Sequence, residues 1–123
     1  MGGTELSEQL RDLKVHYVNE RFVGETITQL KKDLNSAGLE MPEDLNAAEE
    51  VRNYLELLAA QLLEDNTERL FNLLYRIDLP ESEIAAYLHP DHDGVPAVDI
   101  AQAILDREMK KVVIRNYIAE RGI

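Results

Sequence analysis

The chain has 123 residues, of which 45% are hydrophobic, so its length and composition fit one compact globular domain. Acidic residues number 24 and basic residues 13, and the resulting formal net charge of −11 opposes binding to the phosphate backbone of nucleic acids. There is no cysteine, which excludes disulfides, thiol nucleophiles and cysteine-bound metals. No apolar run approaches the ~20 residues of a membrane helix, and no signal segment is evident. We therefore expect a cytoplasmic protein that does not enter membranes.

The first segment, residues 4–37, has the spacing of apolar residues that is typical of helices. Two apolar stripes occur in it, and at 100° per residue they point about 90° apart. The first consists of Leu6, Leu10, Leu13 and Tyr17, and the second of Val23, Ile27, Leu30, Leu34 and Ala37. Either one long helix curves around the core, or the helix breaks near residues 19–24. We favour the break, and Gly38 marks the expected end of the segment.

The second segment, residues 47–77, follows a predicted capping box in which Asn46 is the N-cap and Glu49 the acidic partner. It too carries two stripes, about 110° apart. The first contains Val51, Tyr54, Leu55, Leu58 and Leu62, and the second Leu70, Leu73, Leu74 and Ile77. Two helices that meet at residues 65–67 would explain this pattern, as would one long helix buried on two sides. Because residues 65–67 include neither glycine nor proline, we favour one long helix.

Two prolines open the remaining predicted helices. Pro80 suits the first turn of a short helix over residues 80–88, and Pro96 opens a helix that covers residues 97–120. No strand pattern of useful length is present. The sequence thus predicts an all-α, single-domain helical bundle of four to six helices that covers residues 1–123.

The loop between these two helices is the part of the sequence most suggestive of metal chemistry. It contains His89, Asp91, His92 and Asp93, and zinc binds both imidazole and carboxylate ligands. One observation argues against a metal site: all four side chains come from one short loop, which does not hold them in a fixed arrangement before a metal binds. The loop also fails as a calcium site, because an EF-hand loop needs acidic residues at its first and twelfth positions. We interpret it as a solvated connection, and we expect no metal and no other cofactor.

The last helix is unusual in both charge and apolar pattern. Residues 107–121 carry five basic and two acidic side chains, a net charge of +3 on an acidic chain. This basic strip, from Arg107 to Arg121, is either a binding surface or is paired within the molecule and complements the helix dipole. By the 100° rule, Ile100, Ile114 and Ile118 lie away from the main stripe of Val98, Ala101, Leu105 and Val112. This second apolar face predicts either a central helix or an interaction surface.

Two stretches resemble a family of small, uncharacterised helical bacterial proteins. They are "LFNLLYRIDLPESEI" and "IAQAILDREMKKVVIRNYI", which match an LLYRID pattern followed by an ILxRExxKVxxR helix in the C-terminal half of the chain. The resemblance implies no known activity, and no catalytic or binding residue. It does draw attention to charged residues in the two motifs. We expect Arg76, Asp78, Arg107 and Glu108 to form a structural network that ties the two segments together.

These patterns favour a protein that is not an enzyme. Motifs for nucleotide binding, zinc proteases and serine hydrolases are missing, and no catalytic residue stands out. We expect an interaction or assembly protein that associates with itself through the C-terminal helix, or with another protein. The alternative is an enzyme or metal-binding protein that uses the loop from His89 to Asp93.

Overall fold

The computed structural model describes residues 2–122, with side chains from residue 5 onward. Within this part there are six α-helices, one 3₁₀ helix and no strand, so the predicted all-α fold is confirmed. The elements are α1 (Gly2–Arg11), the 3₁₀ helix η1 (Leu13–Val18), α2 (Glu20–Ser36), α3 (Ala48–Asp65), α4 (Thr67–Arg76), α5 (Glu81–Leu88) and α6 (Pro96–Arg121). None of these helices has an apolar stretch long enough to cross a membrane.

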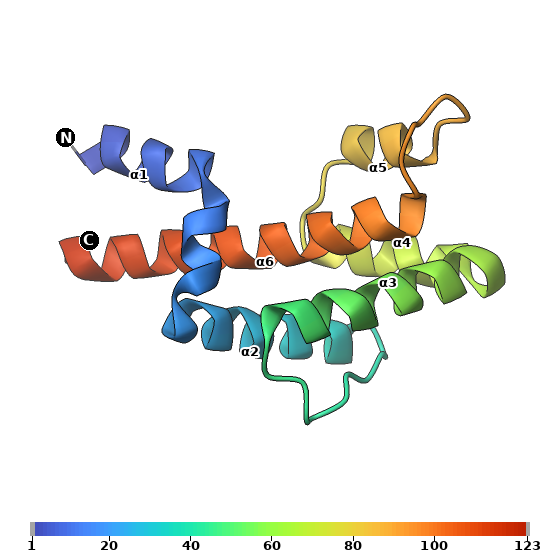
Figure 1. Ribbon diagram of the computed structural model, residues 1–123, viewed down its shortest axis with the longest axis horizontal. Coiled ribbons are helices and arrows are strands. Elements are labelled where there is room, and N and C mark those ends of the chain that lie inside the picture. Colours follow the sequence, from blue (N-terminus) through green and yellow to red (C-terminus); the bar gives the residue numbers. More distant parts are fainter. Residues whose placement is uncertain (1, 123) are drawn as a thin grey trace.

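Helix α6 is the central element of the bundle. Its 26 residues run across the middle of the molecule, with α2 and α3 along one side and α1 and α5 along the other (Figure 1). The contacts between α6 and its neighbours are most extensive with α3 and α2. The described ends of the chain lie at the same end of the molecule, beside the C-terminal turns of α6 (Figure 1). Helices α1, α2, α3 and α5 and the 3₁₀ helix η1 all pack directly on α6.

The core has two parts that occupy different lengths of α6. The larger part encloses the first half of α6, as far as Leu105, and receives side chains from α2, α3, α4 and α5. The smaller part lies along the second half, where α1 and η1 cover the helix. Its buried residues are Phe22, Met109, Val112 and Val113, with partly buried Leu6, Leu10, Leu13, Tyr17 and Val23 around them. The main core therefore does not enclose the second half of α6, and the face of that half turned away from α1 and η1 is more exposed.

Helices α2 and α4 end in the same way, with a residue in the left-handed conformation. At the end of α2 this residue is Gly38, with a φ of 76°, and at the end of α4 it is Asp78, with a φ of 64°. In each case the amide two residues past the helix returns to a carbonyl five residues earlier: Leu39 N to Leu34 O at 2.9 Å, and Leu79 N to Leu74 O at 3.1 Å. These are Schellman motifs, and they bury the apolar residue that follows each turn.

The segment from 47 to 77 is two helices, so the interpretation as one long helix is wrong. The chain leaves the helical conformation at Asn66, whose φ and ψ are −159° and 73°. The Asn66 side chain then accepts a hydrogen bond from Arg69 N at 3.1 Å and caps α4. Two separate helices can each turn their apolar stripe towards the same core. A single helix would have left one of the stripes facing away from it.

The beginning of α3 differs by one residue from the predicted capping box. The N-cap position is Ala47 and not Asn46, and the acidic partner is Glu50 and not Glu49. Glu50 Oε1 accepts a hydrogen bond from Ala47 N at 3.1 Å. Further upstream, the segment 4–37 is interrupted at Asp12 and again at Asn19, whose side chain accepts from Phe22 N and caps α2. The α1–η1 turn that results folds back over the second half of α6.

Candidate functional site

The histidine loop is held against the start of α6 by one of its own histidines. His92 Nε2 contacts Asp99 Oδ2 on the first turns of α6, and the His92 ring packs edge-on against Tyr87 with centroids 5.7 Å apart. Gly94 permits this arrangement, because a Cβ at that position would clash with the Asp99 carboxylate. One imidazole nitrogen of His92 is therefore committed to a structural contact.

The other members of the predicted metal site do not converge with His92. His89 Nδ1 accepts a hydrogen bond from Asp91 N at 3.1 Å and lies 3.8 Å from the Asp91 carboxylate, on the exposed side of the loop. Asp93 is exposed as well. Among residues 2–122 no three histidine or carboxylate side chains are grouped so that they could hold a metal ion. The geometry therefore lends the loop no support as a metal site.

The three isoleucines predicted to form one surface, Ile100, Ile114 and Ile118, differ in their exposure to solvent. Ile100 is 1% exposed and belongs to the main core, so its assignment to a surface is wrong. Ile118 is 40% exposed, and Ile114 is partly buried. Ile100 and Ile118 point in the same direction from the helix axis, since 18 residues make five turns. They differ because the main core encloses only the first half of α6.

Ile114 and Ile118 line a shallow groove, which we call the α6 groove. Its volume is about 470 Å³, and its other lining residues are Gln29, Arg107, Lys111 and Arg115. Three cations and two isoleucines thus face this groove, and no carboxylate lines it. Such a surface is complementary to a segment that carries an apolar side chain among acidic ones.

The basic strip of α6 is partly paired within the molecule. Lys111 Nζ lies 3.1 Å from Asp33 Oδ2 on α2, Arg115 lies 3.7 Å from Glu25, and Arg121 contacts Glu5 on α1. Arg115 remains half exposed, and its guanidinium also donates to Gln29 Oε1 at 3.2 Å. The strip therefore helps to attach α1 and α2 to α6. The exposed part of Arg115 still contributes positive charge to the α6 groove.

Beneath the α6 groove lies a buried carboxyl group that sequence reasoning missed. Glu108 is 0% exposed, and Lys111 Nζ lies 2.7 Å from its Oε1 atom. No donor other than Lys111 reaches either oxygen from residues 2–122. Because Lys111 also contacts Asp33, one ammonium group serves two carboxyl groups between α2 and α6. The sequence did contain a signal, since Glu108 falls on the buried stripe of Ala101, Leu105 and Val112.

Burial changes the protonation of this cluster. It raises the pKa of Glu108 to about 8, and the hydrogen bond to Asp33 acts in the same direction, while Lys111 opposes both. Burial also acts to raise the pKa of Asp33, but its hydrogen bonds from Glu108 and Lys111 outweigh this and leave the pKa below its usual range. Glu108 therefore keeps its proton to a higher pH than an exposed glutamate does, whereas Asp33 is ionised at neutral pH.

The predicted charged network of Arg76, Asp78, Arg107 and Glu108 is not formed as such. Arg107 Nε donates to the backbone carbonyl of Ile77 at 3.2 Å, so α6 is tied to the end of α4 through a main-chain atom. Glu108 is engaged with Lys111. Arg76 and Asp78 are exposed, and neither makes an ion pair within residues 2–122. Of the four residues, only Arg107 joins the LLYRID segment to the helix that carries the second motif.

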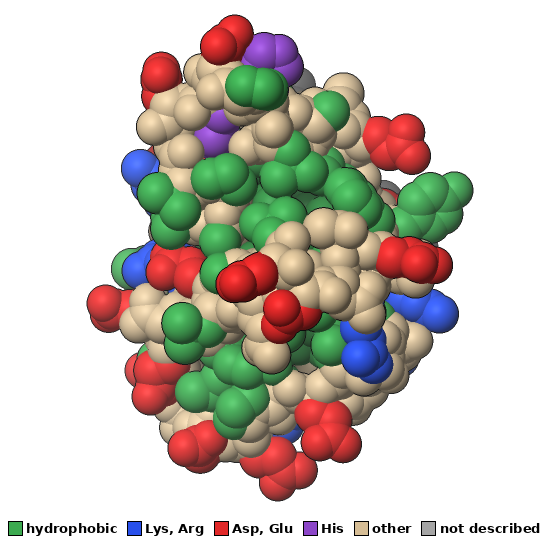
Figure 2. Space-filling model, turned by 90° about the vertical axis from the view of Figure 1, so that its right-hand side faces the viewer, with side chains coloured by type: hydrophobic (Ala, Val, Ile, Leu, Met, Phe, Trp, Pro, Cys, Tyr) green, Lys and Arg blue, Asp and Glu red, His purple; other side chains and the backbone are tan. Residues whose placement is uncertain are grey.

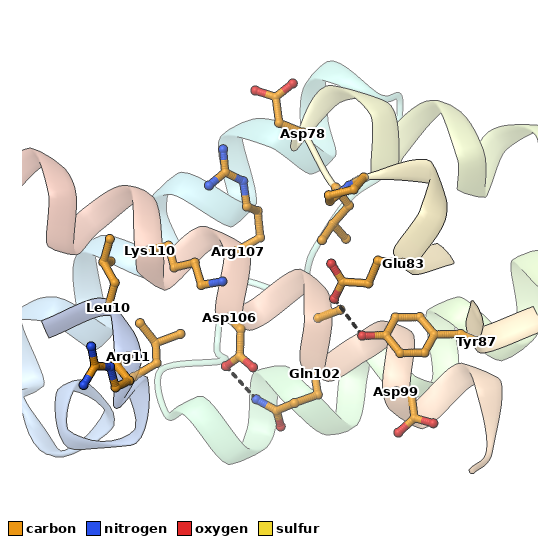
Figure 3. A pocket seen from close by; sticks show the side chains of 14 residues that line it. Leu10, Arg11, Asp78, Glu83, Tyr87, Asp99, Gln102, Asp106, Arg107 and Lys110 are labelled. Carbon is orange, nitrogen blue, oxygen red and sulfur yellow. Dashed lines mark hydrogen bonds between the residues drawn. The ribbon is translucent and has the colours of Figure 1, made fainter. Parts of the chain in front are cut away.

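A larger cleft, of about 650 Å³, lies on a neighbouring face of α6 between the α1–η1 turn and α5, and Arg107 lines both this cleft and the α6 groove (Figure 3). Its charges are mixed, and several of its polar groups already have partners. Tyr87 donates to Glu83 Oε1 at 2.7 Å, and Gln102 donates to Asp106 Oδ1 at 2.9 Å. Burial and the bond to Glu83 raise the pKa of Tyr87, so its phenol remains neutral. The cleft therefore presents no activated base or nucleophile among these groups.

Apolar side chains also gather on the end of the molecule that holds α5 and the start of α6, where more carboxylates than cations surround them (Figure 2). Exposed apolar residues of these elements are Leu88, Val95 and Val98. A second copy of this acidic chain would meet like charge at such a rim, which opposes association there.

No family model, curated protein or solved structure matches the chain significantly. The resemblance of the C-terminal half therefore remains a matter of its two motifs alone.

Proposed function

We propose that the protein is a non-enzymatic interaction or assembly protein that associates with itself through the α6 groove. The observation that carries this proposal is the exposure of Ile118 and part of Ile114 within a cationic groove on a chain of net charge −11. Elsewhere on α6 the corresponding apolar positions are covered by other helices, as Ile100 is.

Apolar contact and charge would act together at this surface. Burial of one isoleucine side chain contributes about 1.5–3 kcal/mol, before the entropic cost of association is subtracted. Because association would bury only the small surface of the α6 groove, we expect a weak complex, with a Kd on the order of 10–100 µM.

The test uses a matched pair of variants on one helix. Val98 and Ile118 are both exposed at 40%, so a glutamate at either position should leave the fold intact. Sedimentation analysis up to about 1 mM should show that the wild-type mass rises with concentration. We expect the Ile118→Glu variant to remain monomeric and the Val98→Glu variant to behave as the wild type. A monomeric wild-type protein over this range would disprove the proposal.

A further inference from the structure

The surface that would enter the α6 groove is found on the outer face of α3. Leu57 lies in the middle of this helix and is 73% exposed. By the 100° rule, exposed side chains within about 60° of Leu57 are few and mostly polar. These residues are Glu50, Asn53, Ala60, Gln61 and Glu64, and with Leu57 they form what we call the Leu57 face.

The Leu57 face and the α6 groove are complementary in charge and in apolar pattern. The face has one leucine between two carboxylates and no cation, whereas the groove has two isoleucines among three cations and no carboxylate. Glu50 and Glu64 lie about four turns apart along α3, on either side of Leu57. If the two helices run antiparallel, α3 can place Leu57 against Ile114 and Glu64 near Arg107, because the members of each pair are seven residues apart. Glu50 takes no part in this contact, since its carboxylate caps α3.

We infer that the protein assembles head to tail, with the Leu57 face of one copy bound in the α6 groove of the next. This inference rests on the proposed self-association and specifies its partner surface. Two different surfaces take part, so the contact is heterologous, and a pair of bound copies still has one free groove and one free Leu57 face. Assembly continues until the copies close into a ring or form a filament. A symmetric contact of one α6 groove with another would instead bring cations against cations.

Complementation between two variants tests the inference. Ile118→Glu damages the groove and keeps the Leu57 face, and Leu57→Glu does the reverse. We expect each variant alone to be monomeric and an equimolar mixture to form a 1:1 complex that grows no further. Wild type should instead show masses above that of a dimer as the concentration rises. Since both side chains are exposed, circular dichroism should show unchanged helix content; Leu57→Ser and Ile118→Ser supply a second pair if either glutamate disturbs folding.

The outcomes separate this inference from the proposal on which it rests. If Leu57→Glu associates as strongly as the wild type while Ile118→Glu does not, the groove mediates association but its partner is not the Leu57 face. If two monomeric variants fail to form a complex when mixed, head-to-tail contact is likewise excluded. If the wild type is monomeric at every concentration, self-association itself is wrong.

Discussion

At the scale of single residues, Glu108 is the position where burial and chemistry conflict most. A carboxyl group with no exposed surface is stable only when it is protonated or paired, and here one lysine serves both Glu108 and Asp33. The raised pKa of Glu108 means that the folded protein binds a proton that the unfolded chain releases between about pH 4.5 and 8. The stabilising effect of this proton is complete below that range and is lost as the pH rises through about 8.

We predict that the free energy of unfolding falls between pH 5 and pH 8.5 and that Glu108→Gln removes most of this fall. The effect should be on the order of a few kcal/mol, since one pKa unit corresponds to about 1.4 kcal/mol. Urea denaturation at several pH values measures it. Glu43→Gln, at an exposed loop position outside both proposed surfaces, is the matched control and should keep the wild-type profile. A similar slope in the wild type and in Glu108→Gln would show that this carboxyl group titrates normally.

Asp78 is a second residue whose conformation has a measurable cost. Its φ of 64° lies in the left-handed region, where glycine is strain-free and other residues are not. We predict that Asp78→Gly stabilises the protein by about 0.5–1 kcal/mol in chemical denaturation. Gly38 ends α2 with the same geometry, so Gly38→Ala should destabilise by a similar amount. Loss of stability in Asp78→Gly would mean that the carboxylate makes a contact worth more than the strain.

At the scale of elements, the boundary between α3 and α4 depends on one asparagine cap. Asn66→Ala removes the acceptor for Arg69 N and should lower the stability by about 1 kcal/mol, as is usual when an N-cap is lost. Asn72 is exposed within α4 and has no capping role, so Asn72→Ala should be neutral or slightly stabilising. Thermal and urea unfolding of the two variants checks this. If the two substitutions changed the stability equally, the cap at Asn66 would contribute nothing and α4 would be stabilised by packing alone.

The helices themselves were largely predictable, because their apolar residues repeat with a period near 3.6. The break at Asn66 was not, since a polar residue without glycine or proline is a weak stop by itself. What decides the break is tertiary: two stripes about 110° apart can reach one core only if the helix is divided there. The same limitation applies to the boundaries of the first segment, where Asp12 and Asn19 both interrupt the helix.

At the scale of the whole molecule, two isoleucines on the same face of one helix differ in exposure because of what packs against each of them. Ile100 and Ile118 share one direction on α6, yet only the second is exposed, because the helices that cover Ile100 end before Ile118. Glu108 was expected in a charged network with Arg76, Asp78 and Arg107, not with Asp33 and Lys111. Its partners, Asp33 and Lys111, come together only once α2 lies beside α6. From the sequence, the candidate surface could therefore be narrowed to one face of α6, but Ile100 could not be separated from the more exposed Ile118.

The central place of α6 also bears on how the chain is synthesised. Translation proceeds from the N-terminus at about 5–20 residues per second, and α1 to α5 all leave the ribosome before α6 does. The buried leucines of α2, α3 and α4 cannot complete either core without α6, so the nascent chain exposes them until residues 96–121 have emerged. The native core can consequently be completed only after almost the whole chain has been synthesised.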